Sequence, residues 1–277
     1  MKRRLGSRLA APFLALLLLG PSLQTVGQEA GAGQVQAAGS TRLQDAETGR
    51  EQEPTRPPGD TVYLEGVSLF SCMVLLPDGY DASKSYPLVV GLHGHGGRAD
   101  DFFLPAPWFG DIGVIFAVPQ APYAFPSAGR IGYSWNLRGF DDEAGDQGAE
   151  ELTERYILDV VESLSESYSV GDVYLMGFSQ GGTFTYTTAI RNHERFTGLV
   201  AIGSRFDPEW FSDSDLAAAK SLRVFISVGR SDGAAPSSAL TRDMLRRMGY
   251  DVEYFDFEGG HIITRSAIEA LLSWLQR

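Results

Sequence analysis

The residue best placed to do chemistry is a serine flanked by glycines. Residues 177–182 read GFSQGG, and they follow a short apolar run at 173–176 and precede a helix-compatible segment at 183–191. Gly-x-Ser-x-Gly between a strand and a helix is typical of a nucleophilic serine exposed on a strained turn, where neighbouring Cβ atoms would clash. The alternative is a glycine-rich loop that only turns the chain. We take Ser179 as the candidate nucleophile.

A serine hydroxyl needs a base to remove its proton. The chain has four histidines: His93, His95, His193 and His261. His261 follows a glycine pair, in a loop between the last expected strand and the last expected helix, whereas His193 is typical of a solvated helix end. His261 is therefore the candidate base.

The base in turn needs a carboxylate to orient it. Asp232 follows the apolar run at 224–228 and so lies just past a strand end. Asp207 and Asp256 are the other carboxylates considered, but Asp207 follows a different strand and Asp256 lies within one. We favour Asp232, which gives the chain order Ser, Asp, His that is typical of α/β-hydrolases.

The tetrahedral intermediate needs backbone N–H donors for its oxyanion. The N–H of Gln180, directly after the serine, is one candidate, and the loop 93–97 (HGHGG) supplies the other. The His-x-His pair in this loop, near Asp100 and Asp101, also suggests half of a zinc site. Only two further histidines could complete such a site, so we predict no metal and no cofactor.

The surrounding sequence predicts an α/β fold with a mostly parallel central sheet of about eight strands, flanked by helices. Helical spacing is clearest around Tyr156 and Met244, and a last helix is expected at 264–276. In such sheets the chemistry lies at the carboxyl ends of the strands. The expected strands are 62–64, 72–76, 88–92, 114–118, 173–176, 199–202, 224–228 and 252–257.

The N-terminal region reads differently from the rest. Four basic residues and an apolar run at 9–19 predict a signal peptide over 1–27, and therefore an exported protein with no stable membrane anchor after processing. A membrane anchor and a buried helix are the alternatives. Residues 28–59 are polar, lack aromatic residues and are expected to be a disordered linker, which leaves 60–277 as the catalytic domain.

Composition narrows the possible partners. The formal net charge is −12, and removal of 1–27 would lower it to about −16, a field that repels nucleic acid and anionic lipid. The single cysteine, Cys72, excludes an intrachain disulfide framework, and its apolar surroundings predict an inert core thiol. The sequence does not indicate an oligomeric state.

Three segments carry a resemblance to a known family. Residues 87–94 (PLVVGLHG), residues 119–122 (PQAP) with Trp135 downstream, and the GFSQGG segment together resemble the phospholipase/carboxylesterase family, which includes the acyl-protein thioesterases. The likeness extends over about 62–277. It implies a cofactor-free hydrolase of esters or thioesters with little or no cap domain. It also implies a Ser179–Asp232–His261 triad and oxyanion donors at the amides of His95 and Gln180.

Aromatic residues after the third and fourth expected strands could line an acyl or aromatic-acid pocket, among them Phe125, Tyr133 and Trp135. Packing of long loops against the domain is the alternative for each.

Together these features predict an exported serine carboxylesterase that acts on a small-molecule ester, with feruloyl, aryl or lysophospholipid-type esters as candidates. The alternatives are a thioesterase, a peptidase or amidase on the same fold, and a non-catalytic binding module.

Overall fold

The computed structural model describes residues 68–137 and 143–277. The expected signal peptide (1–27), linker (28–59) and first strand (62–64) lie outside the described residues. Everything described here belongs to one compact unit, Gly66–Arg277.

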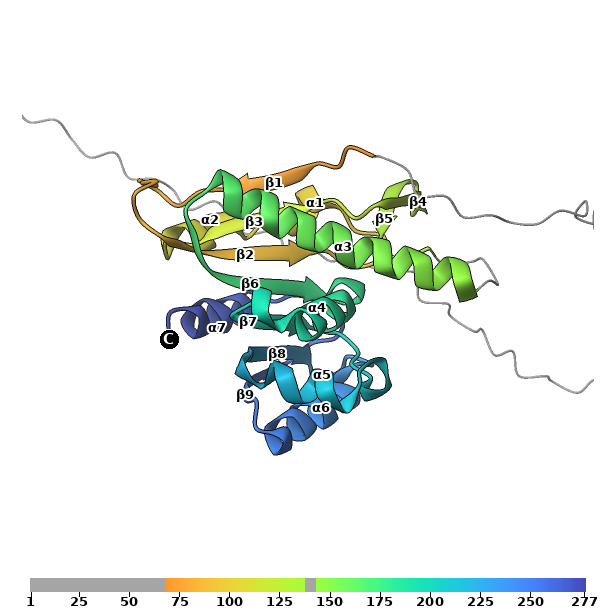
Figure 1. Cartoon of the computed structure of the whole chain (residues 1–277). Helices are drawn as coiled ribbons and strands as arrows, with labels where there is room; N and C mark the ends of the chain where they lie inside the picture. The colour runs from red at the N-terminus through yellow and green to blue at the C-terminus, as the bar shows by residue number, and fades with distance from the viewer. Residues whose placement is uncertain (1–67, 138–142) are drawn as a thin grey trace, which may run out of the picture. The chain divides into compact units, whose positions relative to one another are not determined.

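The central sheet has seven strands in the order β1-β3-β2-β6-β7-β8-β9 (Figure 1). Strand β1 pairs antiparallel with β3, and every other pairing in this sheet is parallel. The mostly parallel sheet predicted from the sequence is therefore confirmed, with each described strand within three residues of its expected bounds at either end. The strands of this sheet are β1 Cys72–Leu75, β2 Tyr86–Leu92, β3 Ile115–Pro119, β6 Val170–Phe178, β7 Gly198–Ile202, β8 Arg223–Gly229 and β9 Asp251–Phe257.

Helices cover both faces because alternate residues of the buried strands are apolar on both sides. Leu88 and Val90 of β2 belong to a core shared with α3, α4, α5 and α6, whereas Val89 belongs to a second core shared with α1, α2 and α7. Helix α3 lies across the front of the sheet in Figure 1. The helices are α1 Ala99–Phe102, α2 Ala106–Asp111, α3 Glu143–Ser167, α4 Gln180–Arg191, α5 Asp213–Ala218, α6 Ala235–Met248 and α7 Arg265–Leu275, with 3₁₀ turns η1 His193–Arg195, η2 Pro208–Trp210 and η3 Ala219–Ser221.

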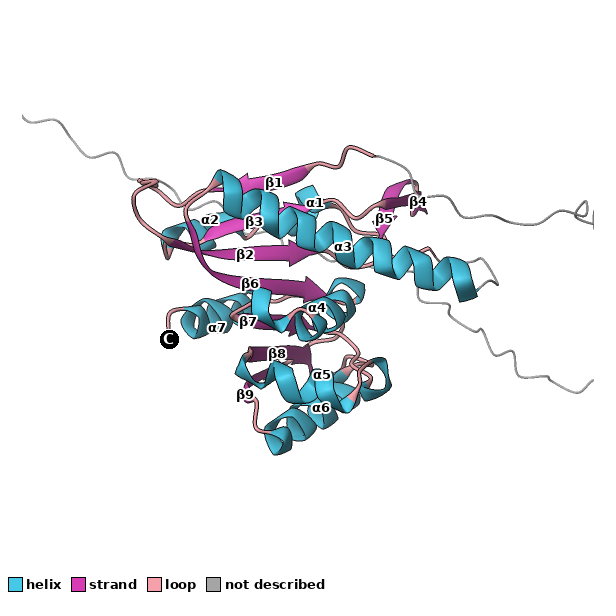
Figure 2. Cartoon of the chain, in the orientation of Figure 1, coloured by secondary structure: helices cyan, strands magenta, loops and turns pink. Residues whose placement is uncertain are grey.

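A separate hairpin, β4 (Tyr123–Ser127) and β5 (Arg130–Ser134), was not predicted (Figure 2). Its turn has φ of 47° at Ala128 and 80° at Gly129, the left-handed pair that tight hairpins need. Strand β5 also pairs with the loop after β2 through two backbone hydrogen bonds. The carbonyl of Tyr133 accepts from Gly96 N–H at 2.9 Å, and the N–H of Tyr133 donates to Gly97 O at 3.2 Å. These hydrogen bonds join the hairpin to the loop that is expected to bind the oxyanion.

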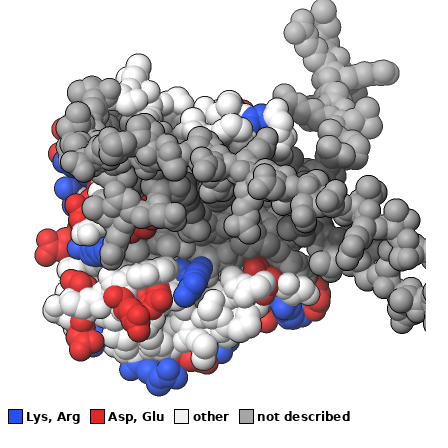
Figure 3. Space-filling view, turned by 90° about the vertical axis from the view of Figure 1, so that its right-hand side faces the viewer, with Lys and Arg blue, Asp and Glu red and all other residues white. Residues whose placement is uncertain are grey.

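Charged side chains of both signs are interspersed on the visible part of one face (Figure 3). Across the described residues, arginines pair with carboxylates, for example Arg130 with Asp101 at 2.6 Å and Arg277 with Glu253 at 3.1 Å. Among the described helices, none is long and apolar enough to cross a membrane.

Candidate active site

Ser179 lies on a strained turn between β6 and α4. Its φ of 54° and ψ of −118° are rare for a residue with a side chain. The turn is also tight: a Cβ at Gly177 would lie 2.2 Å from the Gly181 carbonyl group, and one at Gly181 would lie 2.2 Å from the Leu92 oxygen. The glycines flanking the serine are therefore required by close backbone approach, as the sequence predicted.

Ser179 and the two residues expected to activate it form a hydrogen-bonded series. His261 Nε2 lies 2.8 Å from Ser179 Oγ, and His261 Nδ1 lies 2.8 Å from Asp232 Oδ2. Asp232 is buried while the His261 side chain is 47% exposed, so the series runs from the interior to an accessible serine. A carboxylate that can only accept fixes Nδ1 as the protonated nitrogen, leaving Nε2 to accept the serine proton.

Two interlocked loops hold the histidine and the aspartate together. The N–H of Ser231 donates to Gly259 O at 2.9 Å, and Asp232 Oδ1 accepts from Ala234 N–H at 2.9 Å. Gly203, at the end of β7 with φ of 55°, lies beneath the pair, since a Cβ there would be 3.0 Å from Asp232 Oδ2. The ring of Phe178 packs on His261 at 4.7 Å between centroids.

The other candidate acids lie elsewhere. Asp207 caps η2 by accepting from Glu209 N–H at 3.1 Å, and Asp256 pairs with Arg230 at 3.0 Å. His193 lies in the 3₁₀ turn after α4. Of the three carboxylates considered as the orienting acid, only Asp232 lies within hydrogen-bond distance of His261.

The loop after β2 lies directly against the nucleophile. A Cβ at Gly94 would be 3.4 Å from Ser179 Cβ, so the backbone of Gly94, the residue before His95, lies beside the serine. On the other side, Gln180 begins α4, and its N–H belongs to the first-turn amides that have no intrahelical acceptor. The two segments expected to supply oxyanion donors therefore both adjoin Ser179.

His93 has a structural role that the sequence did not reveal. Its Nδ1 lies 2.9 Å from Gly94 O and must donate, while its Nε2 accepts from Ala121 N–H at 3.2 Å and lies 2.8 Å from Gln120 Nε2. These bonds require the neutral imidazole. Burial of the ring lowers the pKa of His93 to about 4, and His93 thus fixes the start of the loop 93–97.

The expected pocket aromatics separate into two groups. Trp135 is 0% exposed, so its side chain cannot line an open pocket, and that expectation is corrected: the indole packs beside His93 in the core. Phe125 is half-buried and stacks on the exposed His95 ring at 4.7 Å between centroids. Tyr133 is half-buried beside Arg98.

Sequence reasoning also missed the side-chain role of Gln180. Its amide group hydrogen-bonds to Ser134, Trp135 and Asn136 at the end of β5. Ser134 and Asn136, the polar residues on both sides of Trp135, were the sequence feature that could have indicated these hydrogen bonds.

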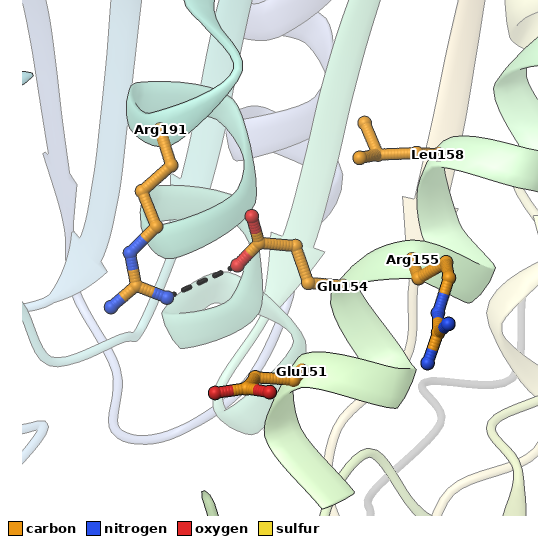
Figure 4. A pocket seen from close by; sticks show the side chains of 5 residues that line it. All are labelled: Glu151, Glu154, Arg155, Leu158 and Arg191. Atoms are coloured by element: carbon orange, nitrogen blue, oxygen red, sulfur yellow. Dashed lines mark hydrogen bonds and ion pairs between the residues drawn. The ribbon is translucent and has the colours of Figure 1, made fainter. Parts of the chain in front are cut away.

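The described residues contain no cluster of three or more potential metal ligands, and burial raises the pKa of the Cys72 thiol to about 12. A hollow between α3 and α4 is lined by four charged side chains and Leu158, with Glu154 paired to Arg191 at 3.1 Å (Figure 4). Arg191 ends the helix that Ser179 begins, so this hollow lies about 18 Å from the serine along α4.

Comparison with known proteins identifies the family of this chain. The sequence profile of the phospholipase/carboxylesterase family matches residues 80–277. The chain belongs to that family. Among solved structures, esterase PE8 is 22% identical, with a TM-score of 0.60 over 75% of this chain and 98% of its own. Acyl-protein thioesterase 2 of Zea mays is 16% identical, with a TM-score of 0.59 over 74% and 97% of the two chains. A ferulic acid esterase is also 16% identical, with a TM-score of 0.55 over 74% and 89%. At these identities the structural likenesses establish the shared α/β-hydrolase fold of this family member.

Proposed function

We propose that this member of the phospholipase/carboxylesterase family is a serine carboxylesterase that works through an acyl-enzyme. The observation that carries the proposal is the unbroken series from Asp232 through His261 to Ser179, with 2.8 Å at each link. Hydrogen-bond reach between nucleophile, base and orienting acid is the signature of an activated hydroxyl.

The proposed reaction has two halves. Ser179 Oγ attacks the ester carbonyl while its proton passes to His261 Nε2, and the amides of Gln180 and His95 stabilise the oxyanion. The intermediate collapses, the alcohol leaves with the proton from His261, and the acyl group stays on Ser179. Water then attacks the acyl-enzyme, its proton passing to His261, and the carboxylic acid is released as Ser179 recovers its proton. Asp232 holds the imidazole of His261 in this tautomer throughout.

The substrate class is proposed as carboxylic esters of small molecules, with aryl, feruloyl and lysophospholipid-type esters as candidates. Structural neighbours described as an esterase, an acyl-protein thioesterase and a ferulic acid esterase support ester chemistry without separating these substrates. The His95–Phe125 stack beside the loop 93–97 is the proposed contact for the acyl or aryl group, with Tyr133 farther along the hairpin. A thioesterase and a peptidase or amidase are the competing activities.

The protein is further proposed to act outside the cytoplasm. The basic and apolar N-terminal segment supports export with cleavage near residue 27. The acidic mature chain would act on neutral or cationic small molecules without nucleic-acid or membrane partners.

A substrate panel with a Ser179→Ala control tests the proposal. The wild-type protein should hydrolyse a short p-nitrophenyl ester faster than the matched thioester and anilide, and Ser179→Ala should reduce ester turnover by at least about 10³-fold because the nucleophile is lost. Preference for the anilide would favour an amidase, and preference for the thioester a thioesterase. Full activity of Ser179→Ala would contradict the serine mechanism.

A further inference from the structure

Trp135 lies between the two segments that adjoin the nucleophile. Its indole Nε1 donates to His93 O at 2.7 Å, and its backbone N–H donates to Gln180 Oε1 at 3.1 Å. Its own carbonyl accepts from Thr153 Oγ1 of α3 at 2.7 Å. One buried residue is therefore bonded to the loop after β2, to the start of α4 and to the covering helix α3.

The indole bond fixes the loop that carries one proposed oxyanion donor. His93 O directly precedes Gly94, whose backbone lies beside the nucleophile, while the far end of the loop is anchored by the backbone hydrogen bonds of Gly96 and Gly97 with Tyr133. His93 is held from its other side by the ring bonds to Gln120 and Ala121. Removing the indole N–H would leave a buried carbonyl without this donor and loosen the near end of the loop, beside the nucleophile.

The second bond fixes the other proposed donor. The side-chain amide of Gln180 is held at its nitrogen by the two residues flanking Trp135 and at its oxygen by the backbone N–H of Trp135 itself. Its Nε2 donates to Ser134 Oγ at 2.9 Å and to Asn136 Oδ1 at 2.5 Å, while its Oε1 accepts from Trp135 N–H. The Gln180 side chain thus ties the first residue of α4, whose backbone N–H is the proposed donor, to the end of β5.

We propose that Trp135 is a positioning residue for the oxyanion hole, holding its two donor segments at a fixed separation through the indole N–H on one side and the backbone N–H on the other. This inference rests on the proposed function. Oxyanion stabilisation depends on donors already placed where the charge develops, and displacement by about 1 Å can cost on the order of 10²-fold in rate.

Two conservative variants test the inference. Trp135→Phe keeps an aromatic ring and removes the indole donor. Gln180→Met keeps the backbone amide and the side-chain length while removing the amide clamp. Trp274→Phe is the matched control, because Trp274 is equally buried but lies in the opposite core, at the end of α7, against Tyr174 and Phe225.

The readouts are kcat and KM for p-nitrophenyl butyrate, the inhibition constant of an aliphatic trifluoromethyl ketone, whose hemiketal with serine places an oxyanion in the hole, and the Tm. For Trp135→Phe and Gln180→Met we expect kcat to fall about 10- to 100-fold with KM within about twofold, and the inhibitor to weaken by a similar factor. Trp274→Phe should lower the Tm and leave kcat and inhibitor affinity within about twofold of wild type.

The inference is overturned if Trp135→Phe and Gln180→Met are both folded by circular dichroism and bind the ketone as tightly as Trp274→Phe does. If wild type itself neither hydrolyses the ester nor binds the ketone, the proposed function fails, and the inference with it. If Trp135→Phe does not fold, the inference is judged on Gln180→Met alone: weakened ketone binding supports it, and unchanged binding overturns it.

Discussion

At the scale of single residues, the proposed reaction depends on which carboxylate orients His261. Asp232 is buried and bonds Nδ1 at 2.8 Å, so its replacement by an amide would present a donor where the imidazole N–H now donates. Asp232→Asn should therefore favour the wrong tautomer and lower kcat on the order of 10⁴-fold, with little change in KM. Steady-state kinetics on a p-nitrophenyl ester measures both.

The control for this prediction is Asp256→Asn. Asp256 lies in β9 and pairs with Arg230 on the exposed surface, so its loss should leave kcat within about twofold. A loss of activity confined to Asp256→Asn would show that the wrong carboxylate has been assigned.

At the scale of elements, the loop after β2 depends on a neutral His93. Burial lowers its pKa to about 4, below the value of about 6.5 expected in the unfolded chain. Between these two pH values the imidazole binds a proton in the unfolded chain but stays neutral in the folded protein. The contribution of neutral His93 to stability is therefore complete above pH 6.5 and is lost as the pH falls toward 4. Between pH 7 and pH 5 the free energy of unfolding should fall by about 2 kcal/mol from this group.

Urea unfolding of wild type and His93→Gln at the two pH values measures this contribution. Taking the difference between the proteins removes the effect of the acidic residues they share. An equal loss of stability on acidification in both proteins would mean that His93 already protonates freely in the folded state.

The sequence predicted the central sheet and the nucleophile turn because local chemistry dictates both. Runs such as 199–202 are buried and apolar on both faces, as is typical of a parallel sheet covered by helices, and GFSQGG has glycines where no Cβ fits. The β4–β5 hairpin was missed because Pro126 interrupts a short strand and its turn contains Ala128 where glycine or asparagine is usual.

The environment of Trp135 could not be predicted for a related reason. Its burial depends on the hairpin docking against a loop some forty residues earlier in the chain. An aromatic residue beside polar neighbours in the sequence could equally line a pocket. The Ser–Asp–His set could be proposed from the sequence because each member lies within four residues after the end of a strand, whereas the Gln180 side-chain contacts depend on that same docking.

At the scale of the whole molecule, the chain is acidic and poor in lysine, which occurs only at positions 2, 84 and 220. The described ion pairs lie largely at the surface, where each contributes little to stability, and stability rests on the two apolar cores. We therefore expect solubility and kcat/KM to persist in about 1 M sodium chloride, where charges are screened beyond about 3 Å. Precipitation or inactivation at that salt concentration, compared with low salt, would show that exposed charge pairs matter more than the cores do.

Ser179 is proposed as the activated nucleophile, and covalent labelling tests this role most directly. The purified protein should react with a fluorophosphonate at a ratio of one label per chain, and peptide mass spectrometry should locate the label on Ser179. A serine without an activating imidazole reacts slowly and should stay unmodified. Absence of labelling in folded protein, or a label on a different residue, would contradict the account.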